Sequence, residues 1–272
     1  MSTATAPEVQ ATDGPAVVVE RRGGALWLRL NRPERLNGIS PEILAGLESG
    51  LDLAEQDPAI RAVVITSTGT AFCAGADLTH VRRVVDESGG HQDFLREAGR
   101  TLNRIEAFPL PVIAAVQGLA LAGGLELLLC TDIVVAAESA RIGDAHANYG
   151  LLPGGGGSIR LPRRIGPARA RYLLFTGDSL PARDFLDSDL VNAVVPEADL
   201  VETVDAIVAK IARKSRSGLR RMKELVADSA DVPQAVGLRM ELQQSAAHEQ
   251  SPDFAEGLAA FFAKRSPRFG DR

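Results

Sequence analysis

The sequence contains few cysteines. Only Cys73 and Cys130 occur among its 272 residues, and each lies in an apolar stretch. Two cysteines are too few for the disulfide framework that stabilises small secreted domains. We therefore expect two free, buried thiols in a protein of a reducing compartment, the cytoplasm.

Long apolar runs are absent as well. No stretch approaches the roughly 18–20 apolar residues that a membrane span needs. The first residues, MSTATAPEVQATDGPA, lack the basic and apolar regions of a signal peptide. The sequence therefore predicts no membrane partner, and it predicts a disordered tail over residues 1–14.

The basic residues form no block. Lys and Arg number 30 while Asp and Glu number 35, which gives a formal net charge of −5. A surface that binds nucleic acid usually carries a cluster of Lys and Arg. We therefore expect no nucleic-acid partner, although this balance still permits a local basic patch for a small anionic ligand.

What the sequence does contain is an alternation of strands and helices. Hydrophobic residues make up 45% of the chain, enough for a sizeable core. The patterns predict a hairpin at 16–31, buried strands at 60–68, 112–118, 132–138 and 191–196, and helices at 41–57, 94–105 and 123–129. Such alternation indicates an α/β core, which we place at 15–198. Residues 199–272 have a helical period and are expected to form a C-terminal helical region.

Four consecutive glycines, Gly154 to Gly157, follow His146 in "ARIGDAHANYGLLPGGGGSIRLP" (140–162). The spacing fits neither a phosphate loop, which needs a lysine after its last glycine, nor a dinucleotide fingerprint, nor a Gly-x-Ser-x-Gly nucleophile elbow. Two interpretations stay open. Either the glycines only let the backbone pass close to another element, or they open a helix whose first amides face an acyl or anionic group.

Two strand-to-turn junctions could each offer one unpaired backbone N–H. They are "AFCAGADL" (71–78) and "QGLALAGGLELLL" (117–129). Two such donors that converge on one point make an oxyanion hole. The second junction also contains Glu126, directly before three leucines. That carboxylate is either used by the chemistry, because burying it is costly, or it stabilises the helix dipole from the first turn.

Several stretches resemble, in the same order, segments of the crotonase superfamily, which is the enoyl-CoA hydratase/isomerase family. The stretches are "NRPERLNGIS", "TAFCAGADL", "AVQGLALAGGLELLLCTDIVVAAESARIG", "GLLPGGGGSIRLPRRIG" and "FFAKRSPRF". The resemblance extends from about residue 26 to 268. It implies a crotonase-like spiral of β-β-α repeats, a C-terminal helical trimerisation region, and a homotrimer or hexamer. It also implies a coenzyme A thioester as substrate, with no metal and no permanently bound cofactor.

The resemblance assigns roles to individual residues. By position in the motifs, the backbone N–H groups of Ala76 and Gly123 are the implied oxyanion hole, and Glu126 is the implied acid/base of an acyl-CoA lyase or isomerase. The residues expected along the CoA and the substrate are Arg35, Leu36, Ala74, Asp77, Leu78, Thr79 and Tyr149. Residues 79–94, with Gly89-Gly90 and many charges, are expected to form a mobile loop at the acyl pocket.

The sequence departs from the family pattern at His146. Family hydratases use two glutamates that share a water, and the second normally lies four residues before the glycine that corresponds to Gly150. A histidine there can serve as an acid or base near neutral pH, or it can simply shape the pocket. Asp144 is a further candidate for the second carboxylate. The remaining histidines, His80 on a polar loop, His91 at a helix start and His248 on the C-terminal helices, are expected at the surface.

Because of this departure, two alternatives to a lyase or isomerase stay open. One is a hydrolase that acts on a CoA thioester or a β-diketone, since a Glu–His pair can orient a water. The other is a member of the family that binds acyl-CoA without catalysis.

Overall fold

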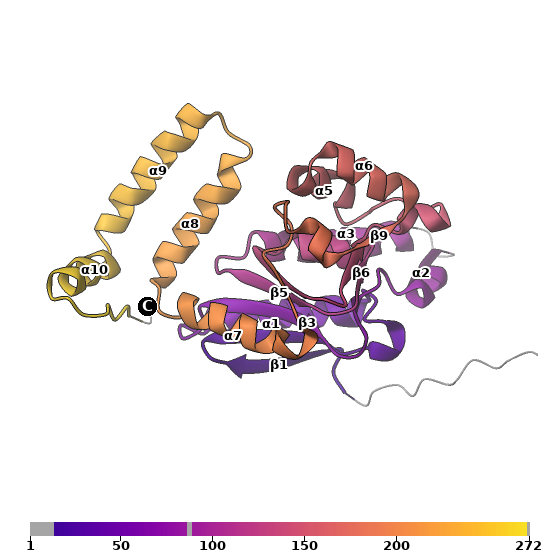
Figure 1. The fold of residues 1–272 in the computed structure, drawn as a ribbon, viewed down its shortest axis with the longest axis horizontal. Coiled ribbons are helices and arrows are strands. Elements are labelled where there is room, and N and C mark those ends of the chain that lie inside the picture. The colour runs from indigo at the N-terminus through magenta and orange to yellow at the C-terminus, as the bar shows by residue number, and fades with distance from the viewer. Residues whose placement is uncertain (1–13, 86–88, 271–272) are drawn as a thin grey trace, which may run out of the picture.

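The computed structural model describes residues 14–85 and 89–270, which form an α/β structure with two sheets (Figure 1). The strands of the larger sheet, in spatial order, are β1 (Val17–Arg22), β2 (Ala25–Leu30), β3 (Ala62–Ser67), β5 (Val112–Val116), β7 (Ile133–Ala137) and β10 (Ala193–Val195). Those of the smaller sheet are β4 (Ala71–Cys73), β6 (Leu119–Leu121), β8 (Arg141–Gly143) and β9 (Ser179–Pro181). The α/β class is confirmed. The tail predicted over residues 1–14 lies outside the described residues except for its last one.

The chain winds through both sheets three times. Each of β3, β5 and β7 is followed by a short strand of the smaller sheet, β4, β6 or β8, and then by helical structure. Successive turns stack in parallel, β3 on β5 on β7 and β4 on β6 on β8. This is the predicted spiral of β-β-α repeats, and it brings the three junctions after β4, β6 and β8 to the same side of the molecule.

The first turn is preceded by a hairpin and a helix. β1 and β2 pair antiparallel around Gly23 and Gly24, whose φ angles of 61° and 98° suit glycine. Helix α1 (Pro41–Gln56) begins where the Ser40 side chain accepts a hydrogen bond from the Ile43 N–H, with Pro41 in the first turn. Both elements were predicted from these signals.

The helices that follow the strands cover the site region. They are α2 (Leu78–Val85), α3 (Gly90–Glu106), α4 (Gly123–Leu129), α5 (Gly157–Ile165) and α6 (Pro167–Thr176). Within the described residues, short 3₁₀ turns connect elements at η1 (Pro33–Arg35), η2 (His146–Tyr149), η3 (Ala182–Phe185) and η4 (Glu197–Asp199).

The prediction of a pocket loop over residues 79–94 is wrong for the described part of that segment. Residues 79–85 belong to α2 and residues 90–94 begin α3, while 86–88 lie outside the described residues. The carboxylate of Asp77 caps α2 by accepting from the Thr79 and His80 N–H groups. Val84 and Phe94 are buried, and their packing stabilises helices where the glycines and charges suggested a loop.

The last helices of the described residues are α7 (Leu200–Ile211), α8 (Arg216–Ser229), α9 (Gln234–Glu249) and α10 (Pro252–Phe262). Helix α7 packs Leu200, Val204 and Val208 against one face of the larger sheet. Helices α8, α9 and α10 extend away from the sheets as an arm (Figure 1). The predicted boundary at residue 198 and the trimerisation role of the helical region stay predictions.

The core occupies both faces of the larger sheet. The main cluster lies between the sheet and α1, α3 and α4, and a smaller one around Trp27 lies under α7. Cys73 and Cys130 are free and buried, as predicted. Burial raises the pKa of Cys73 to about 11 and that of Cys130 to about 12, so both thiols stay protonated and unreactive.

Candidate active site

The junction after β4 presents the N–H of Ala76. Ala76 forms an isolated parallel bridge with Ile39. The hydrogen bonds of this bridge are made by the residues on either side of Ala76. Ile39 N–H donates to the Gly75 oxygen at 2.8 Å, and Asp77 N–H donates to the Ile39 oxygen at 2.8 Å. Since successive backbone groups of an extended chain point in opposite directions, the N–H of Ala76 points away from the bridge.

The junction after β6 presents the N–H of Gly123. Gly123 is the first residue of α4, so its N–H has no acceptor within the helix. The preceding Ala122 has φ 50° and ψ −115°, a conformation that costs energy for a non-glycine residue and is typical of functional sites. The backbone thus holds this amide in a strained turn.

The two amides lie next to each other. A Cβ built on Gly123 would lie 3.5 Å from the nitrogen of Ala76, and one built on Gly75 would lie 3.8 Å from the nitrogen of Gly123. Among the described residues neither the Ala76 nor the Gly123 N–H has an acceptor. Glycine at 123 leaves the space between the amides free of a side chain. Two adjacent unpaired donors of this kind can hold one oxyanion.

Glu126 lies one turn further along α4 and is 4% exposed. Its Oε1 accepts hydrogen bonds from the N–H groups of Gly155, at 2.7 Å, and Gly157, at 2.9 Å. Gly157 begins α5, and Gly156 before it has φ 101°. The four glycines therefore do open a helix, and the anion that the first amides face is the carboxylate of Glu126. The second oxygen, Oε2, accepts no hydrogen bond from the described residues.

The surroundings of Glu126 shift its acidity. Burial raises the pKa of this carboxyl group, and its net pKa lies above the usual value even though Gly157, the charge of His146 and Gly155 oppose the rise. A carboxyl group whose pKa moves toward neutrality is suited to both accepting and releasing a proton.

His146 stands at the start of η2, beside Asp144. Its ring Nδ1 lies 3.0 Å from Asp144 Oδ2, and its backbone N–H donates to Asp144 Oδ1 at 3.2 Å. Burial lowers the pKa of His146, but the hydrogen bond to Asp144, the charge of Asp144 and the charge of Glu126 outweigh it, so the pKa is raised. Glu126 and His146 are thus close enough for their charges to influence one another.

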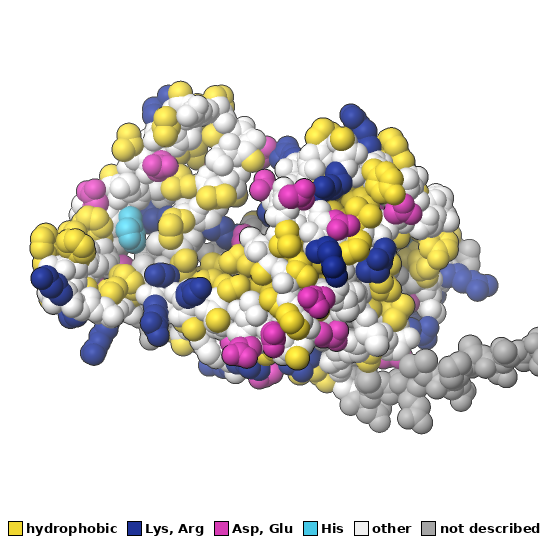
Figure 2. Space-filling model, viewed as in Figure 1, with side chains coloured by type: hydrophobic (Ala, Val, Ile, Leu, Met, Phe, Trp, Pro, Cys, Tyr) yellow, Lys and Arg dark blue, Asp and Glu magenta, His cyan; other side chains and the backbone are white. Residues whose placement is uncertain are grey.

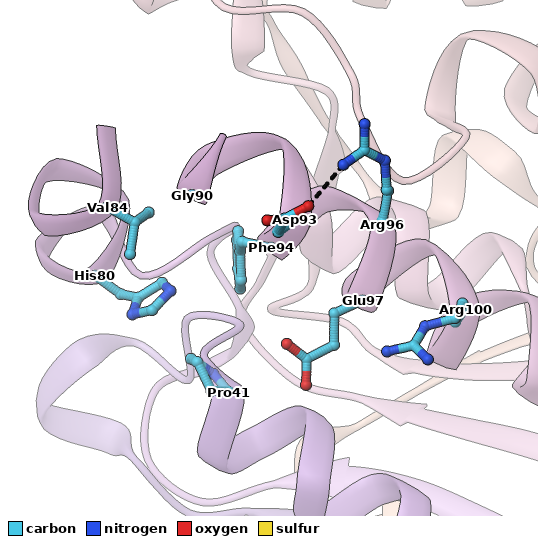
Figure 3. Close-up of a pocket in the computed structure, with 9 residues that line it drawn as sticks. All are labelled: Pro41, His80, Val84, Gly90, Asp93, Phe94, Arg96, Glu97 and Arg100. Carbon is cyan, nitrogen blue, oxygen red and sulfur yellow. Dashed lines mark hydrogen bonds and ion pairs between the residues drawn. The ribbon is translucent and has the colours of Figure 1, made fainter. Parts of the chain in front are cut away.

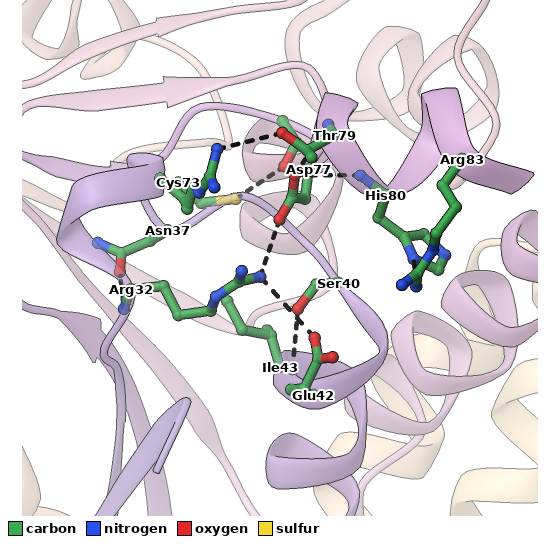
Figure 4. A network of polar contacts seen from close by, with 12 residues as sticks. Arg32, Asn37, Ser40, Glu42, Ile43, Cys73, Asp77, Thr79, His80 and Arg83 are labelled. Carbon is green, nitrogen blue, oxygen red and sulfur yellow. Dashed lines mark hydrogen bonds and ion pairs between the residues drawn. The ribbon is translucent and has the colours of Figure 1, made fainter. Parts of the chain in front are cut away.

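Several of the residues predicted to line the CoA lie around the junction after β4, where Figure 4 shows Asp77 and Thr79. Arg35 Nη1 donates to Thr79 Oγ1 at 3.1 Å, and the Leu36 oxygen accepts from the Ala74 N–H at 3.0 Å. Leu36 and Leu78 are exposed.

Asp77 and Tyr149 differ from the other residues predicted to line the CoA in the surroundings of their side chains. The Asp77 carboxylate is buried, caps α2 and pairs with Arg32 at 2.9 Å, so its side chain already has partners. Burial raises the pKa of Asp77, but hydrogen bonds from two backbone N–H groups and the charge of Arg32 outweigh this effect. The net pKa of Asp77 is therefore below its usual value. Tyr149 is 75% exposed on the surface of this chain.

A cavity of ≈ 600 Å³ opens between the start of α1 and helices α2 and α3 (Figure 3). It is lined by Pro41, His80, Val84, Gly90, Asp93, Phe94, Arg96, Glu97 and Arg100. Ala76, Gly123, Glu126 and His146 do not line it. The prediction that His80 lies on a polar loop is wrong, because His80 belongs to α2, and its ring packs against Phe94 with the centroids 4.9 Å apart and the planes tilted by 57°.

Two further features are absent from the described part of the chain. No three His, Cys, Asp or Glu side chains come together there as a potential metal site. Within the same residues, every helix is too short or too polar to cross a bilayer.

Fold and site together define an α/β protein with a spiral core, a pair of free backbone amides and a buried carboxylate one helical turn away. The family profile described as enoyl-CoA hydratase/isomerase matches residues 20–272. The chain therefore belongs to the enoyl-CoA hydratase/isomerase family, the crotonase superfamily, and it is an enzyme of the hydratase/isomerase type.

Individual relatives agree with this assignment. The chain is 36% identical over 256 residues to a probable enoyl-CoA hydratase of Mycobacterium bovis, covering 94% of this chain and 98% of that protein. It is 37% identical over 252 residues to 1,2-epoxyphenylacetyl-CoA isomerase of Escherichia coli, covering 90% and 95%. The crystal structure of enoyl-CoA hydratase from Bacillus anthracis superposes with a TM-score of 0.89 at 34% identity, covering 94% of this chain and all of that one. The crotonase-like fold is thereby confirmed.

Sequence reasoning missed two contacts in the site. The first is the bonding of Glu126 to the amides of Gly155 and Gly157, for which the run of glycines at a helix start was the available signal. The second is the pairing of Asp144 with His146, for which the Asp-x-His spacing was the only hint.

Proposed function

We propose that this protein acts on acyl-CoA thioesters as a lyase or isomerase that stabilises a thioester enolate. The observation that carries the proposal is the adjacent pair of unpaired amides at Ala76 and Gly123, with the Glu126 carboxyl group one turn away on the same helix. The family, whose named relatives include a probable hydratase and an isomerase of CoA thioesters, supports the same class of substrate.

The two amides would hold the thioester oxygen. Loss or gain of a proton at the carbon next to the thioester passes through an enolate, whose negative charge develops on that oxygen. Preorganised N–H donors stabilise this charge without rearrangement of solvent, and one donor is typically worth about 10²–10³ in rate.

Glu126 would move the proton. Its Oε1 is fixed by the amides of Gly155 and Gly157, so Oε2 is the oxygen left for the substrate or for a water. The raised pKa lets the protonated and ionised forms interconvert at moderate pH.

His146 would take the place of the second glutamate. For hydration, one group must accept a proton from water as its oxygen bonds to the β-carbon, and a proton must reach the α-carbon. The imidazole and the Glu126 carboxyl group together supply one acceptor and one donor. The charge of each favours the ionised form of the other.

The CoA would lie along the exposed edge formed by Arg35, Leu36, Ala74, Leu78 and Thr79, with the backbone at Asp77 beside it. Arg35 would contact a phosphate of the CoA, because guanidinium groups bind phosphate in a bidentate way. Tyr149 would line the acyl pocket. The two free thiols support a cytoplasmic location.

We also propose that the chain forms a trimer or a hexamer through its C-terminal helices. Large apolar side chains are exposed along the arm of α8, α9 and α10, and Figure 2 shows hydrophobic groups spread over it. Those more than two-thirds exposed are Val226, Leu242, Phe261 and Phe262. Exposed apolar surface of this extent is typical of a protein interface.

Activity on a panel of enoyl-CoA and 3-hydroxyacyl-CoA thioesters tests the proposal. Wild-type protein should turn over at least one of them, and Glu126→Gln should lower kcat by about 10²–10⁴ because proton transfer is lost. Equal kcat in the variant would remove Glu126 from the mechanism. Tight binding of acyl-CoA with no turnover would instead favour a binding protein.

A hydrolase is the second candidate. The contact between His146 Nδ1 and Asp144 favours it, because a histidine oriented by a carboxylate can activate a water for attack on a thioester. Release of free CoA thiol distinguishes this reaction from hydration or isomerisation, in which the thioester stays intact.

A further inference from the structure

We propose that Asp144 is a positioning residue that fixes the His146 ring, so that Nδ1 carries the proton and Nε2 is the nitrogen presented to the reacting groups. The proposal rests on the proposed role of His146 in the reaction. In this role Asp144 contacts and orients His146. It does not act on the water or the substrate as a second carboxylate.

Both oxygens of Asp144 are directed at His146. Oδ2 lies 3.0 Å from the ring Nδ1, and Oδ1 accepts from the backbone N–H of the same residue at 3.2 Å. The Asp144 side chain is 1% exposed and that of His146 is 13% exposed. The carboxylate therefore lies behind the imidazole, on the side away from solvent, and the imidazole is the more accessible group of the pair.

The backbone between the two residues is bent to make this contact. Ala145 has φ 60° and ψ −11°, a left-handed conformation that is uncommon for a residue other than glycine. The turn brings side chains two positions apart onto the same side of the chain. A strained residue between two interacting polar groups is typical of a site that needs a fixed geometry.

The direction of the hydrogen bond follows from chemistry. An ionised carboxylate has no hydrogen to donate, so the ring Nδ1 must donate to Asp144. In the neutral imidazole the lone pair is then on Nε2, which can accept a proton from a water or a substrate. When the ring is protonated, Nε2–H becomes the donor. Asp144 thus decides which nitrogen performs the proton transfer.

The charges that face His146 also favour the protonated form of its imidazole. Asp144 faces it from the preceding turn and Glu126 from α4, and both are acidic. Exchange of Asp144 for Asn removes one of the two charges and the ionic hydrogen bond. The basicity of His146 should therefore fall, while Asn can still accept from the backbone N–H and preserve the turn.

The tautomer of His146 can be observed directly in the wild-type protein. ¹⁵N-labelled histidine gives ring signals for four residues, and His146→Gln identifies the one that belongs to His146. At a pH high enough for the ring to be neutral, we expect it to be protonated at Nδ1 with a bare Nε2. A neutral ring protonated at Nε2 would overturn the proposal. This measurement needs neither turnover nor a stable Asp144 variant, so its outcome is independent of whether the proposed reaction is found.

A double-mutant cycle tests the functional consequence. Asp144→Asn should lower kcat by about 10²-fold or more with little change in KM, and it should shift the His146 limb of the pH–rate profile to lower pH. In the His146→Gln background, the same exchange should cost nothing further, because residues that act as a unit are not additive. Equal losses in both backgrounds, with the pH profile unmoved, would show that Asp144 has only a structural role.

The outcomes separate the two proposals. If Glu126→Gln abolishes turnover while Asp144→Asn leaves kcat at the wild-type level, the positioning role is wrong and the proposed function stands. If no thioester is turned over by wild-type protein, the proposed function fails, while the tautomer of His146 still decides whether Asp144 fixes the ring.

Discussion

The backbone nitrogen of Gly155 lies 2.7 Å from Oε1 of Glu126, and residues 29 positions apart thus share a partly buried hydrogen bond. Gly155 is itself held on its carbonyl side, because Arg160 Nη1 donates to its carbonyl oxygen at 2.7 Å. Arg160 is held in turn by an ion pair with Glu106. The orientation of the carboxyl group is therefore set by backbone rather than by a flexible side chain.

Gly155→Ala should damage catalysis through this contact. A Cβ at position 155 would lie 2.7 Å from Glu126 Oε2 and 2.7 Å from Leu102 Cδ1, so the carboxyl group must move. A displacement of this kind by about 1 Å can cost about 10²-fold in rate. We expect kcat to fall by that order, measured with the thioester that wild-type protein turns over best.

The matched control for this change is Gly99→Ala, in the middle of α3. A Cβ there would meet nothing within 4 Å. Because Gly in a helix interior costs roughly 0.5–1 kcal/mol relative to Ala, this variant should be slightly more stable and equally active. Wild-type kcat in Gly155→Ala would show that the close approach of backbone to Glu126 does not matter for the reaction.

Gly123→Ala should weaken the proposed oxyanion hole. The added Cβ would lie 3.5 Å from the Ala76 nitrogen, in the space that the oxyanion is expected to occupy, and 3.0 Å from Ile39 Cδ1. Since the Ile39 side chain can shift, we expect a small change in Tm and a fall in kcat of about 10²–10³. Steady-state kinetics and thermal unfolding measure the two effects.

The neighbouring Gly124→Ala should behave in the opposite way. Its Cβ would overlap the backbone carbonyl of Cys73, which cannot move without disturbing β4. We expect poor folding and a lowered Tm rather than a folded but slow enzyme. If both variants lost activity only in proportion to lost stability, the space at Gly123 would have no special role.

The sequence predicts several strands and helices of the spiral because their signals are local, whereas the spiral winding itself was implied by the family resemblance. Gly23 and Gly24 predict the hairpin because their backbone angles are ones that glycine adopts readily, and the runs that became β3, β5 and β7 are apolar because they are buried. Ser40 and Pro41 predict the start of α1 from capping alone. The two junctions at 71–78 and 117–129 were identified because each follows such a strand, and the family resemblance assigned Ala76 and Gly123 within them.

The contacts of the site were not predicted, because they depend on tertiary structure. The bond from Gly155 to Glu126 joins separate turns of the spiral, and no local pattern encodes it. The pairing of Asp144 with His146 requires a positive φ at Ala145, which alanine adopts rarely. In α2 and the start of α3, burial of Val84 and Phe94 outweighs the glycines and charges that suggested a loop.

Glu126→Gln should stabilise the protein in a pH-dependent way. Burial raises the pKa of Glu126 above 4.5, so the folded chain binds this proton more tightly than the unfolded chain does. The group therefore costs stability as pH rises from the unfolded pKa through the folded pKa, and the full cost is present above the folded value. Gln removes the titration and can still accept from both glycine amides.

Thermal unfolding over a pH series measures this effect. The Tm of Glu126→Gln minus that of wild type should be small near about pH 4.5 and should become more positive toward about pH 8. Glu138→Gln, which exchanges an exposed carboxylate for an amide, controls for the loss of one charge. A difference that shrinks or turns negative with rising pH would mean that the ionised Glu126 is stabilised in the folded protein.

Leu242→Glu should disrupt the proposed oligomer. Leu242 lies on α9 and is 72% exposed in the single chain, so covering it with a partner subunit would remove apolar surface from water. A carboxylate buried in such an interface without a partner is strongly unfavourable. We expect light scattering to give the mass of a trimer or hexamer for wild-type protein and a smaller mass for the variant. Gln243→Glu adds the same charge at the adjacent polar position of α9 and should keep the wild-type mass. A wild-type protein that is monomeric, or a Leu242→Glu variant with unchanged mass at low concentration, would contradict an interface on this arm.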